Sequence, residues 1–362
     1  MLEVALKLVE EITSSGFKAY IVGGFVRDYI LGIGSNDIDI TTSATPKEIK
    51  EIFADSCLPS EDYGSVTVIK KGIRFEITTF REETDYVDNR RPASIKYIDN
   101  LYDDLLRRDF TINTICMDVN GEIVDLLNGR EDIEKRIIKT VGNPKVRFEE
   151  DTLRILRAIR FATILDFKLD RDVIDAIKEC SPLLEKLSIN RKKEELDKIF
   201  SSPNAEKGIE LLLGLGLDKY LKLPNLSKVK CTNSLIGVWT ILDVLDEYPF
   251  SSNERELISS VKEALEHNNL DPYNLYKYGL YANSVAGEIK GVDIKTITES
   301  YNNLVIQSKK DIDITSEEIM EVLKKEPGSY LKEVYNDIER EILYRRLINE
   351  KDKIIEYIVS RY

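Results

Sequence analysis

The 362-residue sequence predicts an α+β fold, in which a head with a mixed β-sheet precedes an all-helical remainder. Strand and helix signals alternate over the first 130 or so residues, whereas almost every later signal is helical. β-branched alternation disappears from this later part, and proline becomes scarce there. The two compositions indicate two kinds of architecture in one chain.

The head begins with a buried strand over 19–24, followed at once by a helix over 25–32. Alternating polar and apolar residues over 37–42 predict a second strand. The tetrapeptide at 45–48 predicts a helix start, because it offers threonine at the N-cap, proline at the first position and glutamate at the third. These elements form a β-α-β-α succession.

The run over 65–80 predicts a hairpin that turns at Lys71-Gly72. The polar segment 81–97 interrupts the pattern, and we expect it to be a mobile connection. Short helix and strand material returns over 110–127. The later helices are expected in these ranges: 131–141, 148–165, 171–180, 191–200 and, separated by short turns, 205–362.

Composition excludes several classes of protein. No apolar run is long enough for a transmembrane helix, and acidic residues within the first 17 positions argue against a signal peptide. The four cysteines form no CxxC pair, which favours reduced thiols in a cytoplasmic protein. The single histidine, His267, is expected at the surface, so catalysis must use carboxylates, arginines, lysines or a metal.

The net charge of −13 argues against a protein that coats nucleic acid nonspecifically. The charge is uneven, because residues 129–200 carry 17 basic and 15 acidic side chains, a net of +2. Local basic surface is therefore possible within an acidic whole.

A phosphate cradle and a carboxylate pair stand close together in the head. Gly23 and Gly24 separate a strand from a helix, where backbone N–H groups can approach an anion, and Arg27 lies one turn further. Asp37 and Asp39 are two residues apart on a strand and point to the same face. Two such carboxylates repel unless a cation such as Mg²⁺ lies between them. Together these features favour phosphoryl or nucleotidyl transfer, although each alone fits a tight turn or a solvated strand.

Two further clusters are candidates for nucleotide contacts. Arg107 and Arg108 could hold phosphates, while Asp109 and Asn113 could meet ribose hydroxyls one turn apart. Glu76 is a third candidate carboxylate, on an otherwise apolar strand. These residues also fit a helix cap with surface charges and an exposed strand position.

Three arginines and an aspartate recur along the helix expected over 148–165. Arg154, Arg157 and Arg160 step round the helix by 60° each, and Asp151 lies one i,i+3 step before Arg154. Ordinary i,i+3 ion pairs would contribute only a few tenths of a kcal/mol. The arrangement fits a polyanionic ligand better, because an aspartate and an arginine can together read the edge of a base.

With these motifs in order, the chain resembles the class II tRNA nucleotidyltransferases, which comprise the CCA-adding enzymes and the bacterial poly(A) polymerases. The resemblance covers roughly residues 15–200 and implies a polymerase-beta-like nucleotidyltransferase head with Mg²⁺ as cofactor. The segments that carry it are 20–42, 78–92, 107–113, 149–162 and 187–196.

The resemblance also implies roles for individual residues. Asp37 and Asp39 resemble the metal-binding catalytic pair, and Gly24 and Arg27 resemble triphosphate contacts. The residues that resemble the ribose and phosphate motif are Arg108, Asp109 and Asn113. Those that resemble the base-reading pair and further nucleotide contacts are, in order, Asp151, Arg154, Arg157 and Arg160.

One departure is Asn190-Arg191, where the family pattern has a glutamate before the arginine. In the family, a segment such as 81–97 is associated with the switch from C to A addition, and here it is complete. The implied domains are a head (1–141), a helical neck (142–203), a helical body (204–290) and a tRNA-binding helical tail (291–362).

The implied reaction adds C, C and A to the 3′ end of tRNA from CTP and ATP, with RNA contacts through lysines such as Lys222, Lys228 and Lys230. No membrane and no obligatory protein partner are expected. An enzyme that adds only A, or a poly(A) polymerase, is the alternative. A small-molecule nucleotidyltransferase would lack the base-reading helix, and a non-catalytic RNA-binding module would have lost Asp37 or Asp39.

Overall fold

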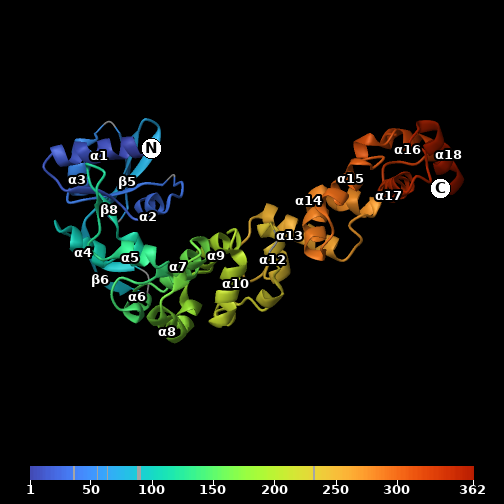
Figure 1. Cartoon of the computed structure of the whole chain (residues 1–362). Helices are drawn as coiled ribbons and strands as arrows, with labels where there is room; N and C mark the ends of the chain where they lie inside the picture. Colours follow the sequence, from blue (N-terminus) through green and yellow to red (C-terminus); the bar gives the residue numbers. More distant parts are fainter. Residues whose placement is uncertain (36, 55, 63, 88–90, 231–232) are drawn as a thin grey trace. The chain divides into compact units, whose positions relative to one another are not determined.

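The computed structural model divides the chain into two compact units, Met1–Pro224 and Asn225–Tyr362, each described here by itself (Figure 1). The finer four-part division expected from the sequence stays a prediction. The structure describes residues 1–35, 37–54, 56–62, 64–87, 91–230 and 233–362.

A mixed sheet of seven strands forms the centre of the head, in the order β3-β4-β5-β2-β1-β8-β9. Strands β2 and β5 are parallel, and the other neighbouring pairs are antiparallel. This sheet confirms the mixed α+β head. The strands are β1 (Ala19–Val22), β2 (Asp39–Thr42), β3 (Cys57–Asp62), β4 (Ser65–Lys70), β5 (Ile73–Thr79), β8 (Cys116–Met117) and β9 (Ile123–Val124).

Helices of the head pack around this sheet through buried apolar side chains, such as Leu8, Val9 and Ile12 of the first helix. The predicted helix start at Thr45 is confirmed, because Thr45 and Glu48 form a capping box. The helices are α1 (Leu2–Ser14), α2 (Gly24–Leu31), α3 (Pro46–Ile52), α4 (Leu101–Leu106), the 3₁₀ turn η1 (Thr111–Asn113) and α5 (Gly129–Glu134).

The segment 81–97 is a β-hairpin rather than the irregular connection expected from its charge. Strands β6 (Arg81–Val87) and β7 (Arg91–Tyr97) pair with each other in a separate two-stranded sheet, and residues 88–90 of this segment lie outside the described residues. Thr84 and Tyr86 alternate along β6, so a strand signal is present among the acidic residues. The alternation of Thr84 and Tyr86 thus indicated a strand correctly, whereas the polarity of the segment did not.

The helical part of the first unit departs from the sequence expectation at two points. The helix expected over 131–141 ends at Glu134, because Arg136 adopts φ 55° and the chain then forms β10 (Ile137–Ile138), parallel to β11 (Lys168–Leu169). The helix expected over 148–165 is broken at Asp151, whose backbone is extended. The remaining elements of the first unit are α6 (Pro144–Glu150), α7 (Leu153–Ile164), α8 (Arg171–Cys180), η2 (Ser181–Lys186), α9 (Ile189–Phe200), α10 (Ala205–Gly214) and α11 (Asp218–Leu221).

The second unit is helical, as the sequence predicts. Trp239 is buried beside Tyr248 and Phe250, and His267 is exposed, as expected. Within the described residues, no helix combines the length and apolar character needed to cross a membrane. The elements are η3 (Leu226–Lys228), α12 (Leu235–Leu242), α13 (Ser252–Leu265), α14 (Pro272–Lys290), α15 (Ile294–Asn302), η4 (Lys309–Asp311), α16 (Ser316–Leu323), α17 (Tyr330–Leu343) and α18 (Lys351–Arg361).

A close approach of α5 to η1 generates the first prediction. A Cβ added at the buried Gly129 would lie 2.3 Å from the carbonyl oxygen of Thr111 and 2.9 Å from Cγ1 of Ile115. Because a backbone carbonyl cannot move aside cheaply, Gly129→Ala should destabilise the head by about 1–3 kcal/mol. Calorimetric unfolding measures this, and Gly214→Ala, with nothing within 4 Å of the added Cβ, is the control. Equal stability of the two variants would contradict the prediction.

Candidate active site

Three carboxylates lie close together where β2, an interior strand of the head sheet, begins, and this end of the strand is termed the acidic edge. Asp39 is the first residue of β2 and lies directly beside Glu76 of the parallel strand β5. The pKa of Asp39 is raised to about 6, first by burial and then by the charges of Asp37 and Glu76, while the charge of Arg108 opposes this rise. The strand expected over 37–42 begins at Asp39, two residues later than predicted. Asp37 lies outside this strand, but its charge still raises the pKa of Asp39. A cation placed here would relieve this repulsion.

This acidic edge offers few protein ligands to a metal. Among the described residues, no group of three or more His, Cys, Asp or Glu side chains is arranged to hold a metal ion. Mg²⁺ is commonly bound through one or two carboxylates together with substrate phosphates and water. The Asp37 and Asp39 carboxylates are suited to binding Mg²⁺ in this way. A site in which protein groups alone surround the ion does not match the described residues.

The glycine turn before α2 has the geometry of an anion cradle. Gly23 adopts φ +85° and ψ −137°, which a residue with a Cβ rarely adopts, and Gly24 is the first residue of α2. A Cβ at Gly23 would lie 3.8 Å from Nη1 of Arg108. Because neither glycine has a side chain, the N-terminus of α2 and the guanidinium of Arg108 can face the same space.

Four of the candidate residues form one hydrogen-bonded chain. Nη1 of Arg27 donates to Oδ1 of Asn113 at 2.7 Å, and Nδ2 of Asn113 donates to Oδ1 of Asp109 at 3.1 Å. Oδ2 of Asp109 accepts from Nη2 and Nε of Arg157, at 2.5 and 2.8 Å. Arg27 also forms an ion pair with Asp28 at 2.7 Å. The chain joins α2, η1 and α7.

The Asp109 carboxyl is the charged centre of this chain. Burial alone would raise the pKa of Asp109, but the Arg157 guanidinium and hydrogen bonds from Asn113, Arg157 and the Phe110 amide hold it at about 2. Asp109 is therefore ionised at neutral pH in spite of its burial, and it fixes the position of Arg157.

Three guanidinium groups surround the Phe161 ring. The Cζ atoms of Arg27, Arg157 and Arg160 lie 5.1, 5.4 and 4.5 Å from its centroid. Arg160 forms an ion pair with the buried Glu195 of α9 at 2.9 Å. The negative face of an aromatic ring accommodates neighbouring cations. Each of these guanidinium groups also pairs with a carboxylate, so the region around Phe161 presents fixed guanidinium donors and little excess positive charge.

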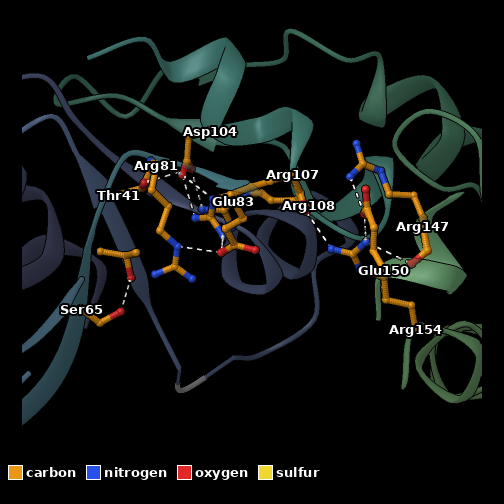
Figure 2. Close-up of polar contacts among 11 residues, drawn as sticks. Thr41, Ser65, Arg81, Glu83, Asp104, Arg107, Arg108, Arg147, Glu150 and Arg154 are labelled. Atoms are coloured by element: carbon orange, nitrogen blue, oxygen red, sulfur yellow. Dashed lines mark hydrogen bonds and ion pairs between the residues drawn. The ribbon is translucent and has the colours of Figure 1, made fainter. Parts of the chain in front are cut away.

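A buried ionic cluster joins α4 to the base of the hairpin (Figure 2). Asp104 is fully buried and accepts hydrogen bonds from Arg107 at 2.7 Å and from Arg108 at 3.2 Å. Arg107 also contacts Glu83 at 3.1 Å, and Glu83 contacts Arg81 at 2.7 Å. Sequence analysis missed Asp104 and Glu83, although the i,i+3 and i,i+4 spacing from Asp104 to the two arginines was a usable signal.

Arg108 retains a donor after these contacts. Its Nε is buried and has no hydrogen-bond partner among the described residues. An unpaired buried donor is costly, so a ligand oxygen at this position would be favourable. The donor fits the phosphate role that the sequence suggests for Arg108.

The proposed base-reading residues lie at the break between α6 and α7. Asp151 does not pair with Arg154, as the i,i+3 spacing had suggested; its Oδ1 lies 3.5 Å from Nη1 of Arg191. Arg154 instead pairs with Glu150 at 2.9 Å (Figure 2). The same Glu150 oxygen accepts from Arg147 at 2.8 Å. The extended backbone at Asp151 separates the two side chains that a continuous helix would have brought together.

Comparison with known proteins identifies the family. The head matches the model "Poly A polymerase head domain" over residues 19–139. Residues 166–229 match "Probable RNA and SrmB- binding site of polymerase A", and 238–358 match a tRNA nucleotidyltransferase domain 2 model. The chain is 35% identical to the CCA-adding enzyme of Ligilactobacillus salivarius, over 97% of this chain and 95% of that protein. The chain belongs to the CCA-adding enzyme family.

Other CCA-adding enzymes are equally similar over their full length. The enzyme of a Geobacillus species is 34% identical, over 99% of this chain and 96% of its own. The crystal structure of the Bacillus stearothermophilus CCA-adding enzyme in complex with CTP superposes with a TM-score of 0.88 at 29% identity. That superposition covers 99% of this chain and 96% of that one. The α+β head and the helical remainder are thus those of CCA-adding enzymes.

The ionised Asp109 generates a pH prediction. Its pKa in the fold, about 2, lies below the ordinary value of 3.8, so the stabilisation is present above about pH 4 and is lost as pH falls towards 2. Asp109→Asn should therefore destabilise the first unit by about 2–4 kcal/mol at pH 7. This deficit should shrink steadily below pH 4.

Calorimetry of the full chain is the appropriate measurement, because the single tryptophan, Trp239, lies in the second unit and does not report on the first. The exposed Asp175 supplies the control variant, Asp175→Asn, which should match the wild type. A deficit that stays constant from pH 7 to pH 3 would show that Asp109 acts without its charge.

Proposed function

We propose that this chain completes the 3′ end of tRNA by adding C, C and A from CTP and ATP, releasing pyrophosphate. The observation that carries the proposal is full-length similarity to CCA-adding enzymes, at 32–35% identity for several curated relatives. The head and neck supply both an acidic edge and a set of fixed cations within one unit. Free thiols at the described Cys57, Cys116 and Cys180 suit the cytoplasm, where we expect it to act.

We further propose that Asp37 and Asp39 hold Mg²⁺. Bound there, the metal would neutralise triphosphate charge and activate the primer 3′-hydroxyl. The raised pKa of Asp39, caused by burial and then by Asp37 and Glu76, supports a cation at this edge. The exposed Glu76 would contribute through its charge.

The triphosphate is assigned to Gly24, Arg27 and Arg108. Gly24 opens α2, where free N–H groups favour anions, and Arg108 keeps a free buried donor. Asp109 and Asn113 are assigned to the ribose. Both lie in the hydrogen-bonded chain that ends on Arg157, which fixes their positions. These residues orient the nucleotide without moving a proton themselves.

Base selection is assigned to Asp151 and Arg154, with Arg157 and Arg160 as further contacts. Arg191 of α9 contacts Asp151, and Glu150 of α6 contacts Arg154. An aspartate acceptor and an arginine donor can recognise the edges of C and A, which share an exocyclic amino group. The protein itself would thus take the place of a template.

The hairpin of β6 and β7 is the element we assign to the change from C to A addition. Arg81 and Glu83 at its base contact one another and, through Arg107, α4. A hairpin attached in this way can reorganise without disturbing the main sheet, from which it is separate. An enzyme that adds only A, or forms poly(A), is the alternative, because these motifs are common to both activities.

The deciding experiment extends tRNA transcripts that end before CCA, after C and after CC. CTP and ATP are supplied singly and together. The proposal requires C, C and A to be added in turn. Use of ATP alone on every primer would instead establish the alternative, and nucleotide transfer to small molecules with no transfer to RNA would exclude both. RNA binding without any nucleotide transfer would show that the chain is an RNA-binding module and not an enzyme.

The metal assignment predicts loss of activity in either aspartate variant. Asp37→Ala and Asp39→Ala should each reduce nucleotide addition by more than tenfold, or about 1.4 kcal/mol of barrier. Thermal stability without Mg²⁺ should hold or rise, because each change removes a repulsion. Asp99→Ala, at an exposed aspartate of the head, serves as the control and should retain full activity. More than a tenth of wild-type activity in Asp39→Ala would refute the assignment.

The base-reading assignment predicts a change in selectivity. A good two-point contact to a base discriminates by about 1–3 kcal/mol, or about fivefold to 150-fold. Asp151→Ala should therefore weaken the preference for CTP and ATP over UTP and GTP by that amount. Single-turnover incorporation of each nucleotide measures it, beside the exposed control Asp175→Ala. Equal loss with all four nucleotides would make Asp151 a structural residue.

A further inference from the structure

Arg154, the arginine assigned to the base, already donates to three acceptors of the protein. Its Nη1 donates to Oε2 of Glu150 at 2.9 Å and to the carbonyl oxygen of Arg147 at 3.2 Å. Its Nη2 donates to the carbonyl oxygen of Arg107 at 2.9 Å, and the side chain is buried. A base edge that approaches Arg154 must therefore compete with these acceptors for its donors.

Asp151, the other residue assigned to the base, is held less tightly. Its Oδ1 lies 3.5 Å from Nη1 of Arg191, and that buried nitrogen makes no hydrogen bond within the described residues. The contact is thus an ion pair without a hydrogen bond. Of the two assigned residues, Arg154 is the one whose present contacts must change before both can meet one base.

Two guanidinium groups share one oxygen of Glu150 (Figure 2). Nη1 of Arg147 donates to Oε2 of Glu150 at 2.8 Å, and this is the same atom that accepts from Arg154. The Glu150 side chain is only 23% exposed. A largely buried carboxylate that loses its cation is destabilising, but here a second cation stays in place. Arg154 can therefore leave Glu150 without leaving that carboxylate unpaired.

Arg147 also makes a contact with α4 that parallels the contact of Arg154. Its Nη2 donates to the carbonyl oxygen of Leu106 at 2.6 Å, next to the Arg107 carbonyl that accepts from Arg154. Both carbonyls lie at the C-terminal end of α4, where backbone oxygens lack partners within the helix. Nε of Arg147 donates to the carbonyl oxygen of Val141 at 2.8 Å. Arg147 would thus keep α4 and α6 joined when Arg154 turns away.

We propose that Arg147 is a positioning residue for base selection, which keeps Glu150 paired and α4 in place while Arg154 exchanges Glu150 for the base. The proposal rests on the assignment of Arg154 to the base, which is part of the proposed function. Arg147 acts through Arg154 and touches neither the nucleotide nor the metal. Without the Arg147 cation, Glu150 would attract Arg154 more strongly and withhold its donors from the base.

The test compares the binding of CTP and UTP to the full chain by calorimetric titration, beside the thermal unfolding of each variant. Arg147→Met removes the second cation and keeps an unbranched side chain, and Glu150→Gln removes the competing charge. The double variant combines these two changes. Arg154→Met tests the underlying assignment, and Arg171→Met, at an exposed arginine of α8, is the control. Incorporation of CTP into a tRNA transcript lacking CCA is followed in parallel.

Arg147→Met should lower the preference for CTP over UTP about tenfold, which is the effect of one lost hydrogen bond to a charged group. Adding Glu150→Gln to the same chain should restore the preference, because a neutral amide retains Arg154 less strongly. The double variant should still unfold at a lower temperature than the wild type, since the hydrogen bonds to Leu106 and Val141 stay lost. Arg171→Met should match the wild type.

A purely structural role for Arg147 predicts the opposite result, because the double variant would then lose a further contact and bind CTP still more weakly. That result, or a wild-type preference in Arg147→Met, would overturn the proposal. Glu150→Gln alone should keep the preference, since the carboxylate competes for Arg154. A tenfold loss in Glu150→Gln would overturn the proposal even if Arg147→Met does not fold.

Two outcomes separate this proposal from those on which it depends. If Arg154→Met keeps the wild-type preference for CTP, the base assignment fails and the role of Arg147 fails with it. Because nucleotide binding is measured without RNA, the expected pattern in a chain that adds nothing to tRNA would refute the proposed function and still support the role of Arg147.

Discussion

The buried carboxylate of Asp109 holds the candidate site together, because it is the point where segments of the head and the neck meet. It accepts from Asn113 on its own segment and from Arg157 on α7, while Asn113 accepts from Arg27 on α2. Removing one partner of a buried pair leaves the other as an uncompensated charge, which is strongly destabilising. The glycine turn, the ribose segment and the neck helix are therefore held in one arrangement before any ligand binds.

The sequence predicted those features whose causes are local. The helix start at Thr45 depends on residues within one turn, and the hairpin turn at Lys71-Gly72 depends on two residues with positive φ, 51° and 74°. The apolar run of β1 and the alternation over β2 are equally visible in the chain. The hydrogen-bond partners of the candidate site residues were not predictable, because hydrogen bonds across 40 or more residues leave no local pattern.

Local signals were misread where charge obscured them. The hairpin 81–97 was interpreted as a connection because acidic residues outnumber its Thr and Tyr positions. The break between α6 and α7 had a signal of its own, since Asp151 accepts from the Leu153 amide as residues before a helix start often do. The i,i+3 and i,i+4 spacing indicated ion pairs of Asp104 with Arg107 and Arg108, but the full burial of Asp104 could not be predicted, because burial depends on elements that arrive from elsewhere in the chain.

A chain of net charge −13 must bind a polyanion through position and not through total charge. Each arginine around Phe161 pairs with a carboxylate, so the two charges of a pair nearly cancel at longer distances. The remaining N–H donors of each guanidinium group are still held in fixed directions. Such preorganised donors spend little conformational entropy when a phosphate arrives. An unpaired group such as Nε of Arg108 then adds the attraction that paired ones lack. Paired cations thus define where a nucleotide fits, and the few unpaired ones determine how strongly it is held.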